Sequence, residues 1–250
     1  MRPENERNPG IFSKIYADVD SGIFNAVSGL RLPENPLVRK ILKETLRGIE
    51  IRSIPESLAG GAVLASNYPD IKETLRAVLK VGCLLPGPEL RLLAIAREDI
   101  VTRTSPFLGG FLKEAVLPAR KDEEGRYSLV PSYAAKALNH LKKGGVLWLS
   151  VTGSTEGNGL KKEHVRHGAV ALAQKAQVPI VPMGIITNEA KKVIQVRFGQ
   201  AMIPSSPEEI SDFNIDEYRH SFSLLVMEAI AELLPPGQKG DFENSLDTPR

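Results

Sequence analysis

Short apolar runs alternate with longer amphipathic segments along most of the chain, and the runs are bounded by Gly, Pro or Asn, as is typical of strands. The predicted strands are Ile49–Ile54, Ala62–Ser66, Leu92–Ala96, Ala115–Ala119, Val146–Ser150, Val178–Ile185 and Val193–Phe198. The predicted helices are Asp70–Val81, Pro131–Lys142, Ala169–Ala176 and Asp216–Leu234. This alternation predicts a single α/β domain with a mostly parallel or mixed central sheet flanked by helices and preceded by a helical N-terminal segment.

The same pattern divides the chain into three parts. Residues 1–48 are expected to form a helical segment, residues 49–235 the α/β domain, and residues 236–250 a flexible polar tail. The tail is polar enough that we expect it to have no means of burying itself. Between the strands, residues 120–126 are charged and are expected to form an exposed loop.

The N-terminal part contains one amphipathic segment. Asn35 is a plausible N-cap with Pro36 at the first helical position, which predicts a helix to about Arg47. Its apolar face is bordered by Arg39, Lys40 and other cations. Two interpretations fit this pattern: a helix packed on the domain, or an interfacial helix that presses its apolar face into a lipid surface.

Composition narrows the classes of function. The chain has 250 residues and a net charge of +2, so no strong field attracts nucleic acid, which is not an expected partner. The single cysteine, Cys83, follows an apolar run, which predicts a core thiol in a reducing compartment. We see no signal peptide and no apolar stretch approaching the ~20 residues that span a bilayer. We therefore expect a cytoplasmic protein, with peripheral contact at the inner face of a membrane as the alternative.

A glycine-rich turn follows the predicted strand Val146–Ser150. Residues 152–159 match the pattern TGxxxGxG of dinucleotide-binding turns, but they lie past the middle of the chain, and no Tyr-x-x-x-Lys pair follows. A phosphate loop would need Gly-Lys-Ser/Thr, and Ser154 lacks the Gly-x-Ser-x-Gly turn of a hydrolase. No cofactor is therefore expected, although the turn and the cations after it suit an anion.

The histidines near this turn do not predict a metal site. His164 and His167 could share a helix face, but no carboxylate or cysteine has matching ligand spacing beyond Glu163. We expect these histidines to face solvent or a phosphate group.

Four segments, in order, resemble the glycerolipid acyltransferase family. Residues 166–183 are similar to its passage KKGAxxLAxxAxxPIVPV, and residues 141–148 resemble the approach to its FPEGTRS motif. Residues 106–120 resemble its second motif, which ends in an arginine, and residues 49–67 resemble the strand that leads to its NHxxxxD motif. The resemblance implies transfer of an acyl group from acyl-CoA or acyl-carrier protein to a glycerol phosphate or a lysophospholipid.

The chain departs from the family where the chemistry is performed. The histidine base and its orienting aspartate correspond to Tyr68 and Glu73. A tyrosine with an ordinary pKa near 10 is protonated at neutral pH and is a poor base. The family's glutamate and arginine of FPEGTRS correspond to Thr152 and Thr155, and of that motif only Gly153 is kept.

The resemblance implies a set of residues for substrate binding. Arg120 is the candidate phosphate ligand, with Lys161, Lys162 and Arg166 as possible supplements. The remaining candidates belong to the altered motif itself: Thr152, Gly153, Ser154 and Thr155. His167 is an alternative base, provided that the fold brings it to the site together with Glu156 or Glu163.

Two hypotheses about function follow. The first is a divergent acyltransferase in which Tyr68 and Glu73 replace the usual His/Asp pair. The second is a non-catalytic protein that binds a lipid phosphate or an acyl chain. The sequence leaves enzyme status open between them.

Overall fold

The fold was obtained as a computed structural model of the chain, which describes residues 44, 46–52, 54–85, 92–99, 115–121, 127–152, 159–188, 193–210 and 214–243. The part of the predicted N-terminal helical segment before residue 44 lies outside these residues, as does the side chain of Cys83. Within the described residues, no helix is both long and apolar enough to cross a bilayer.

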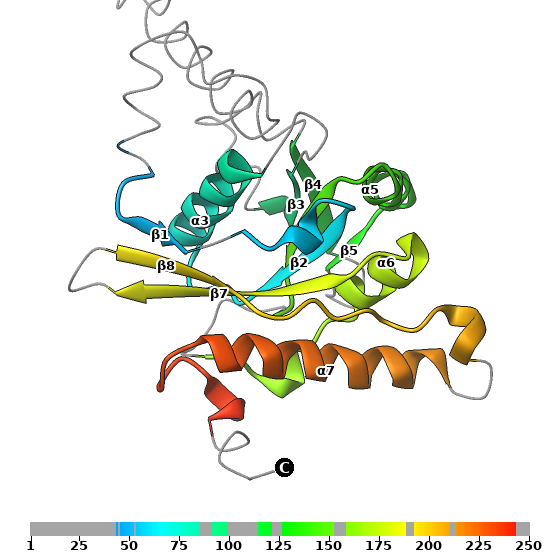
Figure 1. The fold of residues 1–250 in the computed structure, drawn as a ribbon. Coiled ribbons are helices and arrows are strands. Elements are labelled where there is room, and N and C mark those ends of the chain that lie inside the picture. The colour runs from blue at the N-terminus through cyan, green and yellow to red at the C-terminus, as the bar shows by residue number, and fades with distance from the viewer. Residues whose placement is uncertain are drawn as a thin grey trace, which may run out of the picture.

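An eight-stranded mixed sheet forms the centre of the molecule (Figure 1). Its strand order is β1-β8-β7-β2-β6-β3-β4-β5. The strands are β1 (Ile49–Ile51), β2 (Ala62–Ser66), β3 (Leu92–Arg97), β4 (Val116–Lys121), β5 (Tyr127–Leu129), β6 (Val146–Ser150), β7 (Ile180–Asn188) and β8 (Val193–Phe198). Five of them, β7, β2, β6, β3 and β4, run parallel, whereas β8 and β5 pair antiparallel at the two sides.

Helices cover both faces of this sheet (Figure 1). Helix α3 (Ile71–Leu84) packs on one face, in a core that includes Leu64, Trp148 and Met183. On the other face lie α5 (Pro131–Lys142), α6 (Gly168–Ala176) and α7 (Ile215–Leu233), in a core that includes Val63 and Leu147. Alternate residues of β2 and β6 thus enter opposite cores, as the period of a strand requires.

The predicted α/β class, with one mixed sheet flanked by helices, is confirmed. The ranges of β2, β6, β8 and α5 agree with the prediction residue for residue. The expected exposed loop of residues 120–126 is wrong at its first two residues, because β4 continues through Arg120 to Lys121. The short strand β5 was not predicted, since three residues show too little alternation to be recognised.

The C-terminal segment differs from the expected flexible tail in the part that is described. Residues Gly240–Phe242 form a short 3₁₀ helix, and the ring of Phe242 is 1% exposed, in the core beneath α7. The backbone N–H of Asp241 donates to the carbonyl of Leu160 at 2.9 Å, and the carboxylate of Asp241 accepts from the N–H of Lys162 at 2.9 Å. The buried ring and these two hydrogen bonds together anchor this segment.

Candidate functional site

The carboxyl ends of β2 and β6 form the point at which the topology reverses. After β2 the chain passes through α3 to β3 on one side, and after β6 it passes through α6 to β7 on the other side of β2. The two crossover helices lie on opposite faces of the sheet. In open α/β sheets, ligands bind outside the carboxyl ends of the strands at such a point.

Three of the predicted site residues lie at or just beyond the carboxyl ends of β2, β6 and β4. Tyr68 lies two residues beyond Ser66, Thr152 lies two residues beyond Ser150, and Ser66 and Ser150 are register partners on adjacent strands. Arg120 lies near the carboxyl end of β4, also a parallel strand. Gly153, Ser154 and Thr155 lie outside the described residues, so their predicted role stays a prediction.

The end of β2 is held by buried polar contacts. The side chain of Asn67 donates to the carbonyl of Ile185 at 2.8 Å and accepts from the Ile185 N–H at 2.7 Å, which ties β2 to β7. The Trp148 indole N–H donates to the Ser66 hydroxyl at 2.9 Å, and that hydroxyl donates to the Asn67 carbonyl at 2.8 Å. These bonds fix the backbone from which Tyr68 projects.

The environment of Tyr68 makes its phenol a weaker acid. The side chain is half-buried against the core beneath α3. Burial, and then the negative charge of Asp70, raise the pKa of Tyr68 to about 12; Arg97 acts in the opposite direction, and Asp99 in the same. The phenol is therefore protonated at neutral pH and can donate a hydrogen bond, but it cannot remove a proton from an acceptor hydroxyl.

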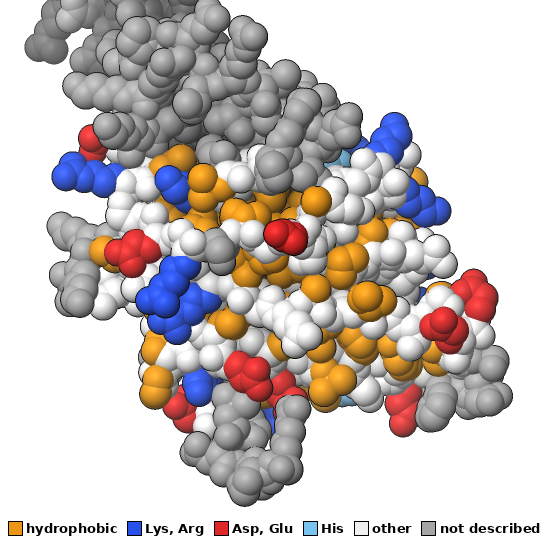
Figure 2. All heavy atoms as spheres, in the orientation of Figure 1, with side chains coloured by type: hydrophobic (Ala, Val, Ile, Leu, Met, Phe, Trp, Pro, Cys, Tyr) orange, Lys and Arg blue, Asp and Glu red, His pale blue; other side chains and the backbone are white. Residues whose placement is uncertain are grey.

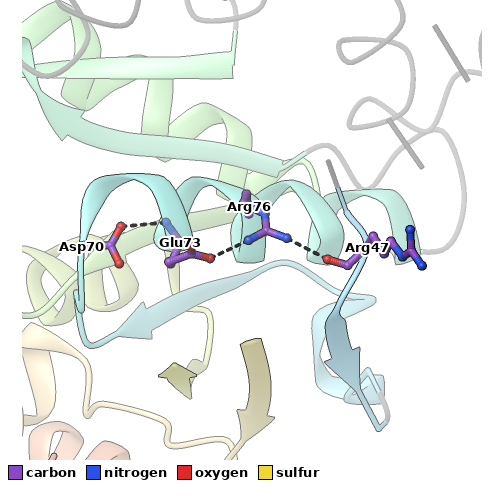
Figure 3. Close-up of polar contacts among 4 residues, drawn as sticks. All are labelled: Arg47, Asp70, Glu73 and Arg76. Atoms are coloured by element: carbon purple, nitrogen blue, oxygen red, sulfur yellow. Dashed lines mark hydrogen bonds and ion pairs between the residues drawn. The ribbon is translucent and has the colours of Figure 1, made fainter. Parts of the chain in front are cut away.

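Glu73 is engaged in a chain of contacts along α3, shown in Figure 3. Its backbone N–H donates to the N-cap carboxylate of Asp70 at 2.8 Å, and its own carboxylate accepts from Arg76 at 2.8 Å. Arg76 also donates to the carbonyl of Arg47 at 2.7 Å, just before β1. This carboxylate stabilises the helix and its attachment to the preceding segment.

Two arginine–carboxylate pairs lie at the ends of β3 and β4. Arg97 donates to both oxygens of Asp99, at 3.0 and 2.8 Å, and its guanidinium lies 4.7 Å from the centre of the Tyr127 ring. The bonds to Asp99 raise the pKa of Arg97. Arg120 donates to Glu98 at 2.9 Å. Sequence reasoning missed Arg97, Glu98 and Asp99, although three consecutive charges directly after a predicted strand were the signal that could have found them.

Thr152 follows β6 and is half-buried. Its hydroxyl lies 3.0 Å from that of Ser150, and its backbone N–H donates to the Ser150 hydroxyl at 3.2 Å. The two hydroxyls can bind a polar ligand group, but neither has a base as a described partner.

The predicted basic cluster lies in the segment that is joined to Thr152 by an antiparallel bridge at Val165. Lys161 is half-buried, and Lys162 and Arg166 are exposed. The Lys162 ammonium lies 5.1 Å from the centre of the Phe242 ring, and its backbone binds Asp241, so the C-terminal segment fixes this lysine.

The histidines form contacts of their own. His167 and His220 approach to 3.2 Å between ring nitrogens, and burial, followed by the charge of His220, lowers the pKa of His167. Glu163, one of the two carboxylates considered from the sequence as a partner of His167, lies 3.5 Å from His164 instead. Glu156 lies outside the described residues. Among the described side chains, no group of three or more His, Cys, Asp or Glu could hold a metal ion.

Charged side chains are distributed unevenly over the face shown in Figure 2. Acidic groups gather on this face where the 3₁₀ helix Pro207–Ile210 leads into α7. That helix carries two exposed carboxylates, Glu208 and Glu209. Basic groups lie in separate clusters near β8 and near α5 on this face.

Comparisons with known proteins identify the fold. No protein-family model matches the chain, and no curated protein matches it. Among solved structures, it is similar to the crystal structure of the 1-acyl-sn-glycerophosphate (LPA) acyltransferase PlsC from Thermotoga maritima. The TM-score is 0.51 and the sequence identity 16%, over 89% of this chain and 91% of that chain. The chain therefore has an α/β fold shared with that acyltransferase.

Proposed function

We propose that this protein binds a lysophospholipid or a glycerol phosphate at the carboxyl edge of β2 and β6, and does not transfer an acyl group by the histidine route. The observation against the histidine route is the environment of Tyr68, whose pKa is raised to about 12, whereas the class of ligand is suggested by the likeness in fold to an LPA acyltransferase. Deprotonating an acceptor hydroxyl near neutral pH requires a base whose pKa is closer to 7. Losing such a base typically slows a reaction by ~10²–10⁴-fold.

The state of Glu73 supports the same proposal. A carboxylate that orients a base must be able to turn towards it, whereas Glu73 is bound by Arg76. Placing a histidine at position 68 would therefore leave that histidine in competition with Arg76 for the carboxylate.

A second candidate is slow acyl transfer from acyl-CoA or acyl-carrier protein, and the likeness in fold to an LPA acyltransferase favours it. In that reaction the acceptor oxygen loses its proton and bonds to the thioester carbon, and the carbon–sulfur bond breaks to release the thiol. Without a histidine at position 68, the proton would have to leave through the substrate itself or be relayed through a hydroxyl such as that of Thr152.

Incubation with labelled acyl-CoA and either lysophosphatidic acid or glycerol 3-phosphate separates the two candidates. We expect lipid binding with no turnover above that of heat-inactivated protein. Turnover that Tyr68→Phe abolishes and the control Tyr133→Phe preserves would overturn the non-catalytic proposal, because Tyr133 lies on α5.

A gain-of-activity variant tests whether the scaffold is otherwise competent. Tyr68→His with Glu73→Asp and Thr152→Glu restores the family's residues at three altered positions. Adding Arg76→Ala releases the carboxylate at position 73, and we expect this quadruple variant to exceed the triple variant in turnover. Equal turnover would contradict the competition of Arg76 for that carboxylate.

We also propose peripheral contact with the inner face of a membrane through the N-terminal segment. Flotation with anionic lipid vesicles, for the full chain and for a chain without residues 1–48, tests this. Flotation of neither protein removes the membrane proposal and leaves the ligand proposal in place.

A further inference from the structure

A pair of histidines joins the start of α6 to the second turn of α7. His167 is the N-cap residue of α6, and its Nε2 atom lies 3.2 Å from Nδ1 of His220. The ring centroids are 5.4 Å apart and the ring planes are inclined by 78°, so the rings meet edge to face. His167 is half-buried and His220 is exposed, so protons from the solvent can reach the pair.

The contact requires one ring nitrogen to donate a hydrogen bond and the other to accept it. When both rings are neutral, a single N–H lies between the two nitrogens. One added proton leaves this bond in place, because one ring still has a lone pair to accept it. A second added proton leaves two donors of like charge facing each other across 3.2 Å. The two rings therefore titrate as a unit, and the hydrogen bond is lost at the second protonation.

Most of the surroundings oppose that second protonation. Burial, and then the charge of His220, lower the pKa of His167. Arg219 on α7 and Arg166 before α6 act in the same direction, whereas Asp216 on α7 acts against them. The carboxylate of Asp216 is also shared with Arg219, whose guanidinium lies 3.6 Å away. A cation at the N-terminus of α6 is further disfavoured by the helix dipole.

The contact lies beside the chain that leads to the candidate site. Val165, two residues before His167, pairs with Thr152 in an antiparallel bridge. Farther along α6, Gln174 accepts a hydrogen bond from Arg219 at 2.9 Å, so a second contact joins the two helices there. Loss of the histidine contact is therefore expected to loosen the first turn of α6 and the neighbouring bridge, without separating the helices.

We infer that His167 and His220 form a pH-sensitive contact, which holds the start of α6 against α7 at neutral pH and releases it in mild acid. Histidine suits this role because its charge changes between about pH 5 and 8. An unfolded histidine titrates near 6.5, whereas the folded pair takes up its second proton at a lower pH. The unfolded chain thus binds more protons in this range, and the stability falls as the pH falls below about 6.5. This inference does not depend on the proposed ligand.

The direct test follows both imidazoles by nuclear magnetic resonance at fixed salt concentration, with EDTA present so that no metal ion bridges the rings. In the wild type, the His167 resonances are expected to titrate below about pH 6.5, and the nuclear Overhauser contact between the rings is expected to disappear over the same range. His220→Gln removes the neighbouring charge and is expected to shift the His167 midpoint upwards. An unchanged midpoint, or an inter-ring contact that persists when both rings are protonated, overturns the inference.

Urea denaturation at about pH 7 and about pH 5.5 gives a second measurement, in a range where carboxylates with ordinary pKa values near 4 stay ionised. His167→Gln cannot take up the proton, so its urea midpoint is expected to fall less than half as much as that of the wild type. The matched control is His164→Gln, which removes a histidine that lies beside Glu163 and is expected to keep the wild-type dependence.

Equal losses in His167→Gln and the wild type contradict the inference. So does a control whose pH dependence falls as far as that of His167→Gln. Circular dichroism establishes that each variant is folded, and His220→Gln takes the place of His167→Gln in this measurement if the latter unfolds.

Discussion

Two consecutive residues at the end of β2 have different roles. Asn67 is 8% exposed and uses its amide to bind both backbone groups of Ile185, so it is a structural link between β2 and β7. Tyr68 is half-buried and lies where the ligand is proposed to bind. The raised pKa of this phenol is a property of its surroundings and is not encoded in the residue type.

Titration of Tyr68 is expected to be displaced towards high pH. The difference in phenolate absorbance between the wild type and Tyr68→Phe should have a midpoint at about pH 12. The folded state holds this proton more tightly than the unfolded chain, whose tyrosine titrates near 10. The contribution to stability is thus complete below pH 10 and is lost as the pH rises to 12. A midpoint near 10 would contradict the proposed environment.

Asn67→Ala is expected to lower the free energy of unfolding by about 1–3 kcal/mol, because it leaves the N–H and carbonyl of Ile185 without their partner in a buried position. Urea denaturation measures the change. The control is Asn139→Ala, an exposed position on α5, where a change within about 0.5 kcal/mol is expected. Equal effects at the two positions would show that the link between β2 and β7 is unimportant.

At the residue scale, the sequence predicted the positions of Tyr68 and Glu73 but not their partners. Their separation of five positions matches the family's motif, whereas the hydrogen bond from Arg76 to Glu73 forms only because α3 brings residues three positions apart onto the same face. The pairing of Arg120 with Glu98 joins residues on different strands, and only the register of β3 and β4 reveals it.

Helix α3 connects the candidate site to the segment before β1. Asp70 caps its first turn, and the contacts of Glu73 and Arg76 continue from there to the carbonyl of Arg47 (Figure 3). A carboxylate at the N-terminus of a helix also interacts favourably with the helix dipole. This helix is therefore stabilised by the groups that border the ligand edge.

Asp70→Ala is expected to lower the free energy of unfolding by about 1 kcal/mol, because the N–H of Glu73 loses its acceptor. Asp70→Asn keeps an acceptor at the cap and is expected to lie within about 0.5 kcal/mol of the wild type. Urea denaturation at neutral pH measures both. If the two variants are equally destabilised, the charge of Asp70 rather than its hydrogen bond holds the helix.

At the element scale, the helices and strands with clear periodicity were predicted well. Pro131 at the start of α5 and the apolar run of β6 are strong local signals. The end of α3 was placed three residues early, because the helix continues to Leu84 before Leu85 leaves it in an extended conformation. The 3₁₀ helix at Gly240–Phe242 has only three residues, too few to show a periodicity, and its burial depends on packing against residues distant in the sequence.

At the scale of the whole molecule, the C-terminal segment closes over the chain that follows the candidate site. The backbones approach so closely here that a Cβ atom on Gly159 would clash with the backbone of Gly240, and a Cβ atom on Gly240 would clash with the backbone of Leu160. Both glycines have positive φ angles, which other residues rarely adopt. The position of Lys161 and Lys162 thus depends on residues about 80 positions later in the chain.

Phe242→Ala is expected to lower the free energy of unfolding by about 3–5 kcal/mol, because it removes a fully buried ring. Phe242→Leu retains most of the apolar volume and is expected to lose less than half as much. Chemical denaturation measures both changes. A small effect of Phe242→Ala would mean that this segment is not part of the cooperative fold.

The order of the sheet has a consequence for synthesis of the chain. Strand β2, which carries Asn67 and leads to Tyr68, pairs only with β6 and β7. A ribosome that has completed β2 must still make more than a hundred residues before Ile185 can meet Asn67. Until β6 is made, both edges of a strand whose five residues are all buried in the folded protein are unpaired, which is a template for association with other chains. Fragments that end before β6 are therefore expected to aggregate. We expect the nascent chain to be prone to association with other chains until the partner strands of β2 have been synthesised.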